Sequence, residues 1–331
     1  MKELVDIHTH LLSSDVKFNR IYDKIALKIF GKKMGIDFSE LKQDPYLGYT
    51  KALIRNIRES KKIKKVVLFG VDAKFNLEGK ETDKDITVCA KNEDVLELYS
   101  ANKDIIIPFF SINPNRADAL DLIDKYVALG FRGAKFLQNY WQIDLNDKRY
   151  IPYFKKLAEH NLPLIIHTGS ENSIESKKEY ESITMLEAPL REGVVVIAAH
   201  MGLEYSLKRV FKSFSKDAKN FNKEYFLLLD MLKKEKNLYA DISAILTPFR
   251  AKVLRDLSKR AEIHDKLLFG TDFPVPISVI FSSYDLPLKV RLLLNKIKNP
   301  FDRYVSALHY YFKEDNPIFT NYKKVLTKVL H

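Results

Sequence analysis

Residues 3–10 read Glu-Leu-Val-Asp-Ile-His-Thr-His, a short apolar run that ends in two histidines one residue apart. In a β-strand, side chains two residues apart share a face, so His8 and His10 can direct two imidazoles at one point. Two imidazoles on one face suit a metal ion, although a single His-x-His pair is weak evidence by itself. A metal site here requires further ligands from the rest of the chain.

This opening run is the first of eight short β-rich runs. They cover residues 3–8, 65–71, 105–112, 133–137, 163–167, 194–199, 237–242 and 267–270. Helical spacing of apolar residues marks the segments 117–129, 151–160, 182–191 and 247–261, and Gly130 and Gly193 stand where helix C-termini are expected. A strand followed by a helix, repeated eight times, predicts a single closed (β/α)8 TIM barrel rather than an open doubly wound sheet. We expect one domain over residues 1–331.

Two connections are too long for simple crossovers. Residues 11–64 follow the first run and contain an amphipathic stretch at 22–30 and a break at 45–48, and residues 206–236 follow the sixth run. Long loops at this end of a barrel commonly shape access to the substrate, and packing as additional surface helices is the alternative. After Pro274-Val275-Pro276 we expect a helical tail that ends near Leu330.

Composition narrows the class of protein. The 331 residues are 46% hydrophobic and 30% charged, as in a globular protein with a sizeable core. Asp6 follows Met1 too closely for a signal peptide, and the apolar runs are far shorter than the roughly 20 residues that cross a bilayer. A single cysteine, Cys89, excludes an internal disulfide and a thiolate zinc cluster. We expect a cytoplasmic protein that is not integral to a membrane.

The formal net charge of +12 raises the question of a nucleic-acid partner. The lysines are spread over the chain, for example at 61–65, 177–178, 208–219 and 233–236, and no nucleic-acid-binding motif accompanies them. We therefore interpret them as solvated helix faces and expect no nucleic-acid partner. The positive field favours a small-molecule substrate that is anionic.

Further polar groups stand at the ends of the later runs. Lys135 lies in the fourth run, His167 closes the fifth, His200 follows the sixth and Asp272 follows the eighth. In a (β/α)8 barrel the C-terminal strand ends meet on one face, where reactive groups gather. Imidazoles and a carboxylate form a sound ligand set for a divalent ion such as zinc, which in catalytic sites keeps a position open for water. The order of these groups predicts a metal centre at the barrel mouth.

Several longer motifs accompany these groups, namely Ile112-Asn113-Pro114-Asn115, Gly130-Phe131-Arg132-Gly133-Ala134-Lys135, Leu164-Ile165-Ile166-His167-Thr168-Gly169, Tyr239-Ala240-Asp241-Ile242-Ser243 and Leu267-Leu268-Phe269-Gly270-Thr271-Asp272. With the opening motif they resemble, in order, the strand motifs of the amidohydrolase superfamily. Within it they are most similar to the amidohydrolase-2 branch, which includes aminocarboxymuconate semialdehyde decarboxylase. The resemblance runs from Glu3 to Pro274.

The resemblance implies a role for each candidate. His8, His10, His167 and Asp272 would be the metal ligands, and His200 would lie beside the ion or the substrate. His200 and Asp272 would be the catalytic residues. The resemblance favours one ion, with two as the alternative. The chemistry of the donors favours zinc, with manganese as the alternative.

Lys135 has two readings. Other branches of the superfamily carry a carboxylated lysine on the fourth strand that bridges two metal ions, and Lys135 lies on the matching strand. The alternative is a lysine that binds an anionic group of the substrate or pairs with a carboxylate inside the barrel. The number of bound ions distinguishes the two readings.

Five other side chains have a functional and a structural reading each. Asp6 is either an acceptor that supports the ligands or a buried carboxylate with a backbone partner. Asp241 and Ser243 either orient ligands or cap a helix, and we favour capping. Trp141 is either a substrate platform or part of a packed loop, and Arg250 either binds a substrate anion or lies exposed on a helix, which we favour.

The same site supports two reactions. We expect a hydrolase in which metal-activated water attacks an amide, lactone or ester carbonyl of a small molecule. The alternative is metal-dependent non-oxidative decarboxylation of a small carboxylic acid, which releases carbon dioxide without taking up water. A catalytically silent binding protein would have lost a ligand, and no ligand is missing. Barrels of this family often pair, so a homodimer is expected.

Overall fold

The protein is described by a computed structural model that covers residues 3–17, 31–171, 174–204, 222–248, 250–275, 277–283 and 285–330. Eight parallel strands correspond to the eight predicted runs. They are β1 (Leu4–His10), β2 (Ile63–Phe69), β5 (Ile106–Pro108), β6 (Ala134–Phe136), β7 (Leu164–Ile166), β8 (Val196–Ala198), β9 (Leu238–Asp241) and β10 (Leu267–Leu268). The prediction of an α/β fold with parallel strands is confirmed.

The eight strands form two parallel sheets whose edges meet. One sheet has the order β1-β2-β5, and the other has the order β10-β9-β8-β7-β6. A single parallel bridge joins the sheets at each seam, between Thr9 and Phe273 on one side and between Phe110 and Ala134 on the other. The C-terminal ends of strands from both sheets therefore face the same region, as the placement of the predicted site requires.

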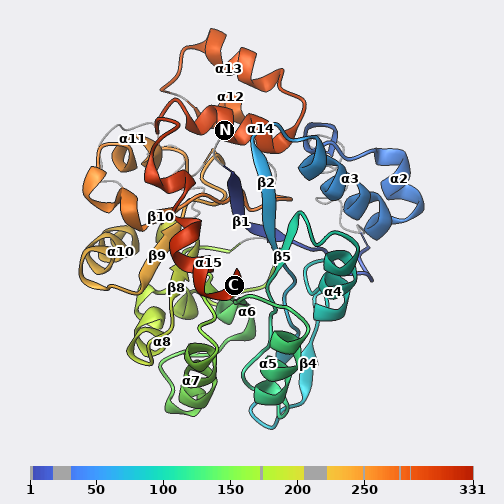
Figure 1. The fold of residues 1–331 in the computed structure, drawn as a ribbon, viewed down its shortest axis with the longest axis vertical. Coiled ribbons are helices and arrows are strands. Elements are labelled where there is room, and N and C mark those ends of the chain that lie inside the picture. Colours follow the sequence, from blue (N-terminus) through green and yellow to red (C-terminus); the bar gives the residue numbers. More distant parts are fainter. Residues whose placement is uncertain are drawn as a thin grey trace.

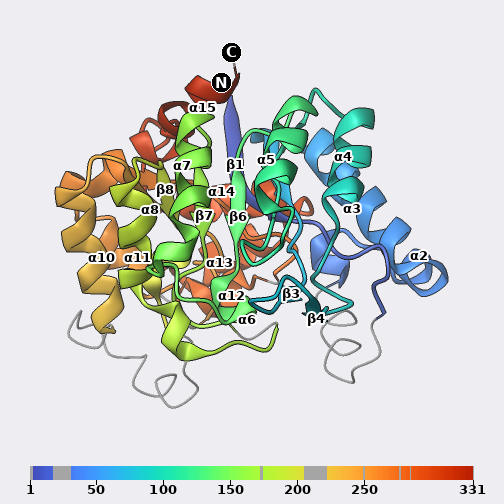
Figure 2. The same ribbon diagram turned by 90° about the horizontal axis from the view of Figure 1, so that it is seen from below.

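Helices surround the strands (Figures 1 and 2). They are α2 (Phe38–Gln43), α3 (Pro45–Glu59), α4 (Asn92–Ala101), α5 (Ala119–Ala128), α6 (Gln138–Trp141), α7 (Ile151–Glu159), α8 (Glu187–Arg191), α10 (Lys223–Lys234), α11 (Val253–Leu257), α12 (Val279–Ser282), α13 (Leu288–Asn295), α14 (Pro300–Leu308) and α15 (Tyr322–Leu330). Within the described parts of the chain, every helix is too short or too polar to cross a bilayer. Gly130 and Gly193, at the expected helix ends, have positive φ angles of 99° and 83°.

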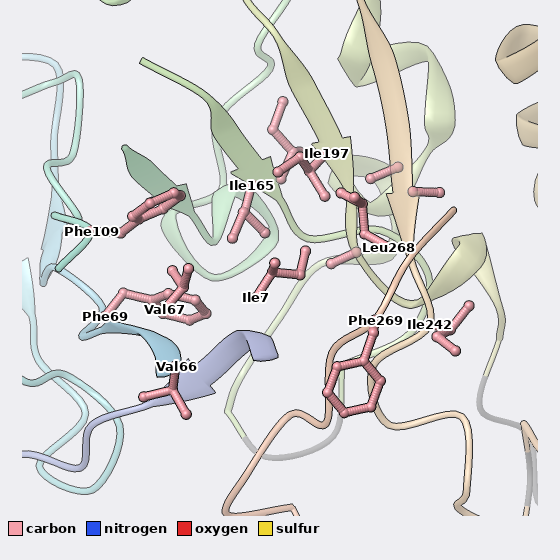
Figure 3. Packing of buried hydrophobic residues seen from close by; sticks show 14 of the residues in the cluster. Ile7, Val66, Val67, Phe69, Phe109, Ile165, Ile197, Ile242, Leu268 and Phe269 are labelled. Atoms are coloured by element: carbon pink, nitrogen blue, oxygen red, sulfur yellow. The ribbon is translucent and has the colours of Figure 1, made fainter. Parts of the chain in front are cut away.

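Apolar side chains from both sheets fill the space between the strands and between strands and helices. Ile7, Val67, Ile165, Ile197 and Leu268 come from five different strands and belong to one buried cluster (Figure 3). Each such aliphatic side chain stabilises the fold by roughly 1.5–3 kcal/mol relative to an exposed one. This packing holds the strand ends, and with them the site, in fixed relative positions.

The helix predicted over 247–261 is much shorter in the structure. Helix α11 covers only Val253–Leu257, and turns precede it. Pro248 keeps the preceding residue, Thr247, away from helical backbone angles, so it explains why no helix begins at Thr247. The prediction overlooked this proline.

The break predicted at 45–48 lies slightly earlier in the structure: α2 ends at Gln43, and after Asp44 the helix α3 begins at Pro45. Proline is well suited to this position, where no backbone N–H is needed. The side chain of Asp44 caps the helix by accepting a hydrogen bond from the Leu47 amide at 2.9 Å. The segment after β1 thus carries the helices α2 and α3, and α10 follows β8, while the predicted stretch 22–30 and residues 205–221 lie outside the described residues.

A short antiparallel hairpin, β3 (Lys74–Phe75) and β4 (Glu81–Asp83), was not predicted. Its turn has a recognisable signal in Asn76 and Gly79. The Asn76 side chain accepts a hydrogen bond from the Lys80 amide at 2.9 Å, and Gly79 has a φ of 78°. The strands are too short for alternation of apolar residues to reveal them.

The C-terminal segment attaches to the N-terminal side of the fold. The Tyr322 hydroxyl donates to the Glu3 carbonyl at 2.9 Å, just before β1. The Phe269 amide, just after β10, donates to the Ile318 carbonyl at 3.1 Å. The tail therefore contacts the two neighbouring strands that lead to the predicted ligands, and Figure 2 shows both chain ends on the same side.

Candidate metal centre

Strand β1 and the turn after β10 bring three predicted ligands together. His8 and His10 share a face of β1, as their spacing predicted. Asp272 is fixed against this strand, because its amide donates to the His8 carbonyl at 2.8 Å. Gly270 permits the approach, since a Cβ at this position would lie 2.9 Å from the His8 Cβ.

The facing atoms of these three side chains lie at nearly equal distances. His8 Nε2 is 3.3 Å from His10 Nε2 and 3.4 Å from Asp272 Oδ1, and His10 Nε2 is 3.2 Å from the same Oδ1. Nitrogen and oxygen ligands bind zinc at roughly 2.0–2.2 Å in a tetrahedron, which separates two ligands by roughly 3.3 Å. The three donor atoms therefore fit a divalent ion of this size.

Asp241 holds His8 in the tautomer that a metal ligand needs. Its Oδ2 is 2.7 Å from His8 Nδ1, and its Oδ1 accepts from the backbone amides of Ser243 at 3.0 Å and His200 at 3.1 Å. Burial alone would raise the pKa of Asp241, but its contact with His8 and the hydrogen bonds from Ser243 lower it to about 2. The carboxylate therefore holds a proton on Nδ1, and the Nε2 lone pair faces His10 and Asp272.

The preference for helix capping by Asp241 and Ser243 is thus wrong, and the alternative of orienting the site histidines is correct. Burial, followed by the charge of Lys135, lowers the pKa of His8, so its ring is neutral and can act as a ligand. The Ser243 hydroxyl donates to Asp241 and lies 2.8 Å from His200 Nδ1. One carboxylate and one hydroxyl therefore orient both histidines.

His200 lies beside the three donor atoms. Its backbone is in the left-handed region with a φ of 61°, and its Nδ1 is 3.9 Å from Asp272 Oδ2. Because the Ser243 hydroxyl proton goes to Asp241, His200 Nδ1 donates to the Ser243 oxygen and keeps a lone pair on Nε2. Burial, followed by the charge of Arg250, lowers the pKa of His200 well below its usual value. A neutral ring can accept a proton or bind a metal ion.

A wider grouping is also within reach of one ion. His8, His200 and Asp272 each offer an atom such that all three lie within 4.8 Å of one another. The rings of His8 and His200 have centroids 4.9 Å apart. His200 is therefore close enough to take part in the chemistry of the centre.

His167 directly follows strand β7 and lies next to His200. Its ring centroid is 4.9 Å from that of His200. Its Nδ1 is 3.7 Å from Glu171 Oε2, too far for a hydrogen bond, and its buried Nε2 has no partner among the described residues. Burial lowers the pKa of His167 well below its usual value, so the ring is neutral. An unpaired buried nitrogen costs about 1–3 kcal/mol, and a bound metal ion would remove this cost.

Lys135 lies within strand β6 and is fully buried. Its Nζ has no hydrogen-bond partner among the residues that the structure describes. The ammonium lies 5.4 Å from the ring centre of Phe69, and the same ring packs edge-on against His8 at 5.1 Å and His10 at 4.7 Å. Burial lowers the pKa of Lys135 to about 8. Lys135, His8 and His10 therefore all contact the same ring, that of Phe69.

Two of the lesser candidates have structural roles. Asp6 accepts from the backbone amides of His8 and Thr271, both at 3.0 Å, and burial raises its pKa to about 7. Of its two readings, the buried carboxylate with backbone partners is correct. Trp141 is buried and donates from Nε1 to the Asp72 carbonyl at 2.9 Å, so it is a packing residue.

The exposed helix position favoured for Arg250 is wrong. Arg250 is only 6% exposed, precedes helix α11, and donates from Nη2 to the Ser170 carbonyl at 3.0 Å. Sequence reasoning also missed Glu171 and Phe69. Glu171 has a recognisable signal, four residues after His167, whereas Phe69 looks like any other apolar residue at the end of a strand.

A family model described as Amidohydrolase, of the amidohydrolase-2 type, matches residues 5–292. The chain belongs to the amidohydrolase-2 family, whose members are metal-dependent enzymes and include hydrolases and decarboxylases. This match confirms the resemblance seen in the strand motifs. No curated protein matches the sequence.

Solved structures similar to this chain share its fold at low identity. An uncharacterised TIM-barrel protein from Bordetella bronchiseptica is 16% identical with a TM-score of 0.52, covering 92% of this chain and 99% of that one. A probable 2-pyrone-4,6-dicarboxylic acid hydrolase from Acinetobacter baumannii with citric acid bound is 14% identical (TM-score 0.55, covering 98% and 99%). A 2,6-dihydroxybenzoate decarboxylase complexed with 2,6-dihydroxybenzoate is 14% identical (TM-score 0.50, covering 99% of each). At this identity they support the TIM-barrel type of fold alone.

Proposed function

We propose that this protein is a metal-dependent hydrolase of small molecules, with one divalent ion held by His8, His10, His167 and Asp272. The observation that carries the proposal is the spacing of 3.2–3.4 Å among the facing atoms of His8, His10 and Asp272. The unpaired Nε2 of His167 is available as the fourth ligand atom. Nitrogen and oxygen donors of this kind favour zinc, with manganese as the alternative.

A bound divalent ion supplies a Lewis acid that polarises a carbonyl oxygen and lowers the pKa of water. His200 provides the acid and base functions beside it. With Nδ1 hydrogen-bonded to Ser243, its Nε2 accepts the proton of the attacking water and returns it to the leaving nitrogen or oxygen as the bond to carbon breaks. Asp272, whose Oδ2 is 3.9 Å from His200 Nδ1, is the second candidate for this proton.

Decarboxylation is the second candidate reaction, because the same residues can perform it. In this case the bond between carbon and the carboxylate breaks, carbon dioxide leaves, and the carbon takes a proton from His200 or Asp272. The family includes both classes, and the structurally similar proteins include one named as a hydrolase and one named as a decarboxylase. The products distinguish the reactions, since only hydrolysis takes up water.

We also propose that the two parallel sheets form one closed (β/α)8 barrel and that residues 1–331 form a single domain. The parallel bridges at both seams support closure. The contacts of the C-terminal segment with Glu3 and Phe269 support a single unit.

Elemental analysis of protein purified without chelators tests the metal centre. We expect about one zinc or manganese ion per chain, and its loss in the double variant His8→Ala, His10→Ala. His160→Ala, at a partly exposed histidine paired with Asp124, is the matched control and should keep the ion. Protein without metal, even after reconstitution, would refute the proposal.

The loaded enzyme is then assayed with amides, lactones, esters and carboxylic acids, with carbon dioxide release as the readout for decarboxylation.

A further inference from the structure

The buried ammonium of Lys135 is not explained by the metal centre. It lies in strand β6, fully buried, and no described residue accepts a hydrogen bond from its Nζ. An ammonium held away from water without a partner is costly, by several kcal/mol in a dry site. The fold keeps this group nonetheless, which indicates that its partner comes from outside the chain.

The carboxylates of the site do not supply this partner. The negative charges of Asp241, Asp272 and Glu171 reach Lys135 through space and favour its charged form. None of the described carboxylates accepts a hydrogen bond from Nζ: Asp241 bonds to His8, and Asp272 faces His8 and His10.

A bound metal ion would give the unpaired nitrogen of His167 a partner, but it would make the burial of the Lys135 ammonium more costly. An unpaired imidazole nitrogen is satisfied by a cation. An ammonium is repelled by one, so the free energy cost of Lys135 grows when the ion is present. The ring of Phe69, which contacts His8, His10 and Lys135, places the ammonium beside the proposed ligands and not in a separate part of the fold.

We infer that Lys135 binds the carboxylate of the substrate, and that the enzyme acts on small molecules that carry a carboxylate close to the reacting bond. This inference rests on the proposed metal centre. A carboxylate matches one ammonium in charge, whereas a phosphate dianion would bring additional negative charge toward Asp272 and Glu171. The inference names a substrate class that hydrolysis and decarboxylation can share.

The competing reading is a carboxylated Lys135 that bridges two metal ions. In that case the lysine would itself be an anion, and it would be part of the metal centre. The two readings differ in a property that does not depend on activity: the carboxylated form predicts two ions per chain and a loss of metal on replacement of Lys135. The inference predicts one ion and no loss.

The test measures binding of benzoate and succinate to the metal-loaded protein by calorimetry, for wild type and for Lys135→Met, which keeps the length of the side chain without its charge. Loss of a charge-assisted hydrogen bond should weaken carboxylate binding roughly tenfold to hundredfold, with metal content unchanged. Lys155→Met, at an exposed lysine on α7, is the control and should bind as wild type does. A crystal structure of the wild-type protein with benzoate gives a second test that needs no variant, and should place a carboxylate oxygen within hydrogen-bond distance of Nζ.

Three results would overturn the inference. They are equal carboxylate binding by wild type and Lys135→Met, no binding of either carboxylate to metal-loaded wild type, and two ions per chain of which Lys135→Met loses one or both. Wild-type protein that binds no metal at all would instead refute the proposed function, so the two failures are distinguishable.

Discussion

The two sides of the site differ in whether the protein supplies hydrogen-bond partners for their buried polar atoms. On the side of β1, β9 and β10, His8 Nδ1, Asp241 and Ser243 are hydrogen-bonded to one another or to backbone amides. On the side of β6 and β7, Lys135 Nζ and His167 Nε2 have no partner among the described residues. On the first side the groups behind the proposed ligands are paired within the protein. On the second side, by our proposals, a bound ion would supply the partner of His167 and the carboxylate of a substrate would supply that of Lys135.

The largest effect is expected from removing donors on the first side. The double variant His8→Ala, His10→Ala lacks two of the three closely spaced donor atoms, so zinc affinity should fall by at least about a thousandfold. Competition with a chromophoric chelator measures the affinity. His160→Ala should match wild type, and a double variant that still binds zinc tightly would place the metal elsewhere.

The next largest effect on zinc affinity is expected from Asp241, the carboxylate that holds His8 on the first side. Asp241→Asn replaces the charged acceptor of His8 Nδ1, at 2.7 Å, and should weaken zinc binding roughly tenfold to hundredfold, as loss of a partner behind a ligand commonly does. The same competition experiment measures it. Asp256→Asn is the matched control, because that carboxylate accepts from Tyr225 and Arg260 away from the site. Equal weakening in both variants would indicate a general loss of stability.

The second side predicts an unusual dependence of stability on pH. The pKa of Lys135 is lowered by burial from 10.5 to about 8, so between these values the unfolded chain binds more protons than the folded chain. This group therefore makes the free energy of unfolding of the metal-free protein rise with pH across that window. Lys135→Met should remove the rise and stabilise the protein at neutral pH by about 1–3 kcal/mol. Urea unfolding at several pH values measures both effects, and parallel curves for the two proteins would contradict the prediction.

The smallest effect is expected at Glu171. Its Oε2 is 3.7 Å from His167 Nδ1, a full ångström longer than the contact between Asp241 and His8. Glu171→Gln should therefore change zinc affinity by less than about threefold. An effect as large as that of Asp241→Asn would show that His167 is supported by the protein after all, and would remove the contrast between the two sides.

Most of the fold was predictable because it depends on local patterns. The eight strands are short apolar runs, and the polar residues at their ends pointed to a shared face before any contact was known. Some errors were also local. Residues 45–48 were read as a break where α3 begins, and the helix expected over 247–261 covers only Val253–Leu257, so that Arg250 lies before it and is buried.

The parts of the site that were not predicted depend on contacts between residues far apart in the chain. His8 and Asp241 are separated by 233 residues, and nothing in the motif around Asp241 tells a helix cap from a partner of His8. Phe69 is an apolar residue in an apolar strand, and only the structure brings its ring against His8, His10 and Lys135. Identities at strand ends were therefore predictable, whereas pairings across the sheets were not.

The attachment of the C-terminal segment has a consequence for biosynthesis. His8 leaves the ribosome well before Asp272, and the residues Ile318 and Tyr322, whose contacts support β10 and β1, emerge later still. A nascent chain cannot bring the three closely spaced donors together until Asp272 has emerged. Binding of the metal ion to the full donor set should therefore be a late step in the synthesis of this segment of the chain.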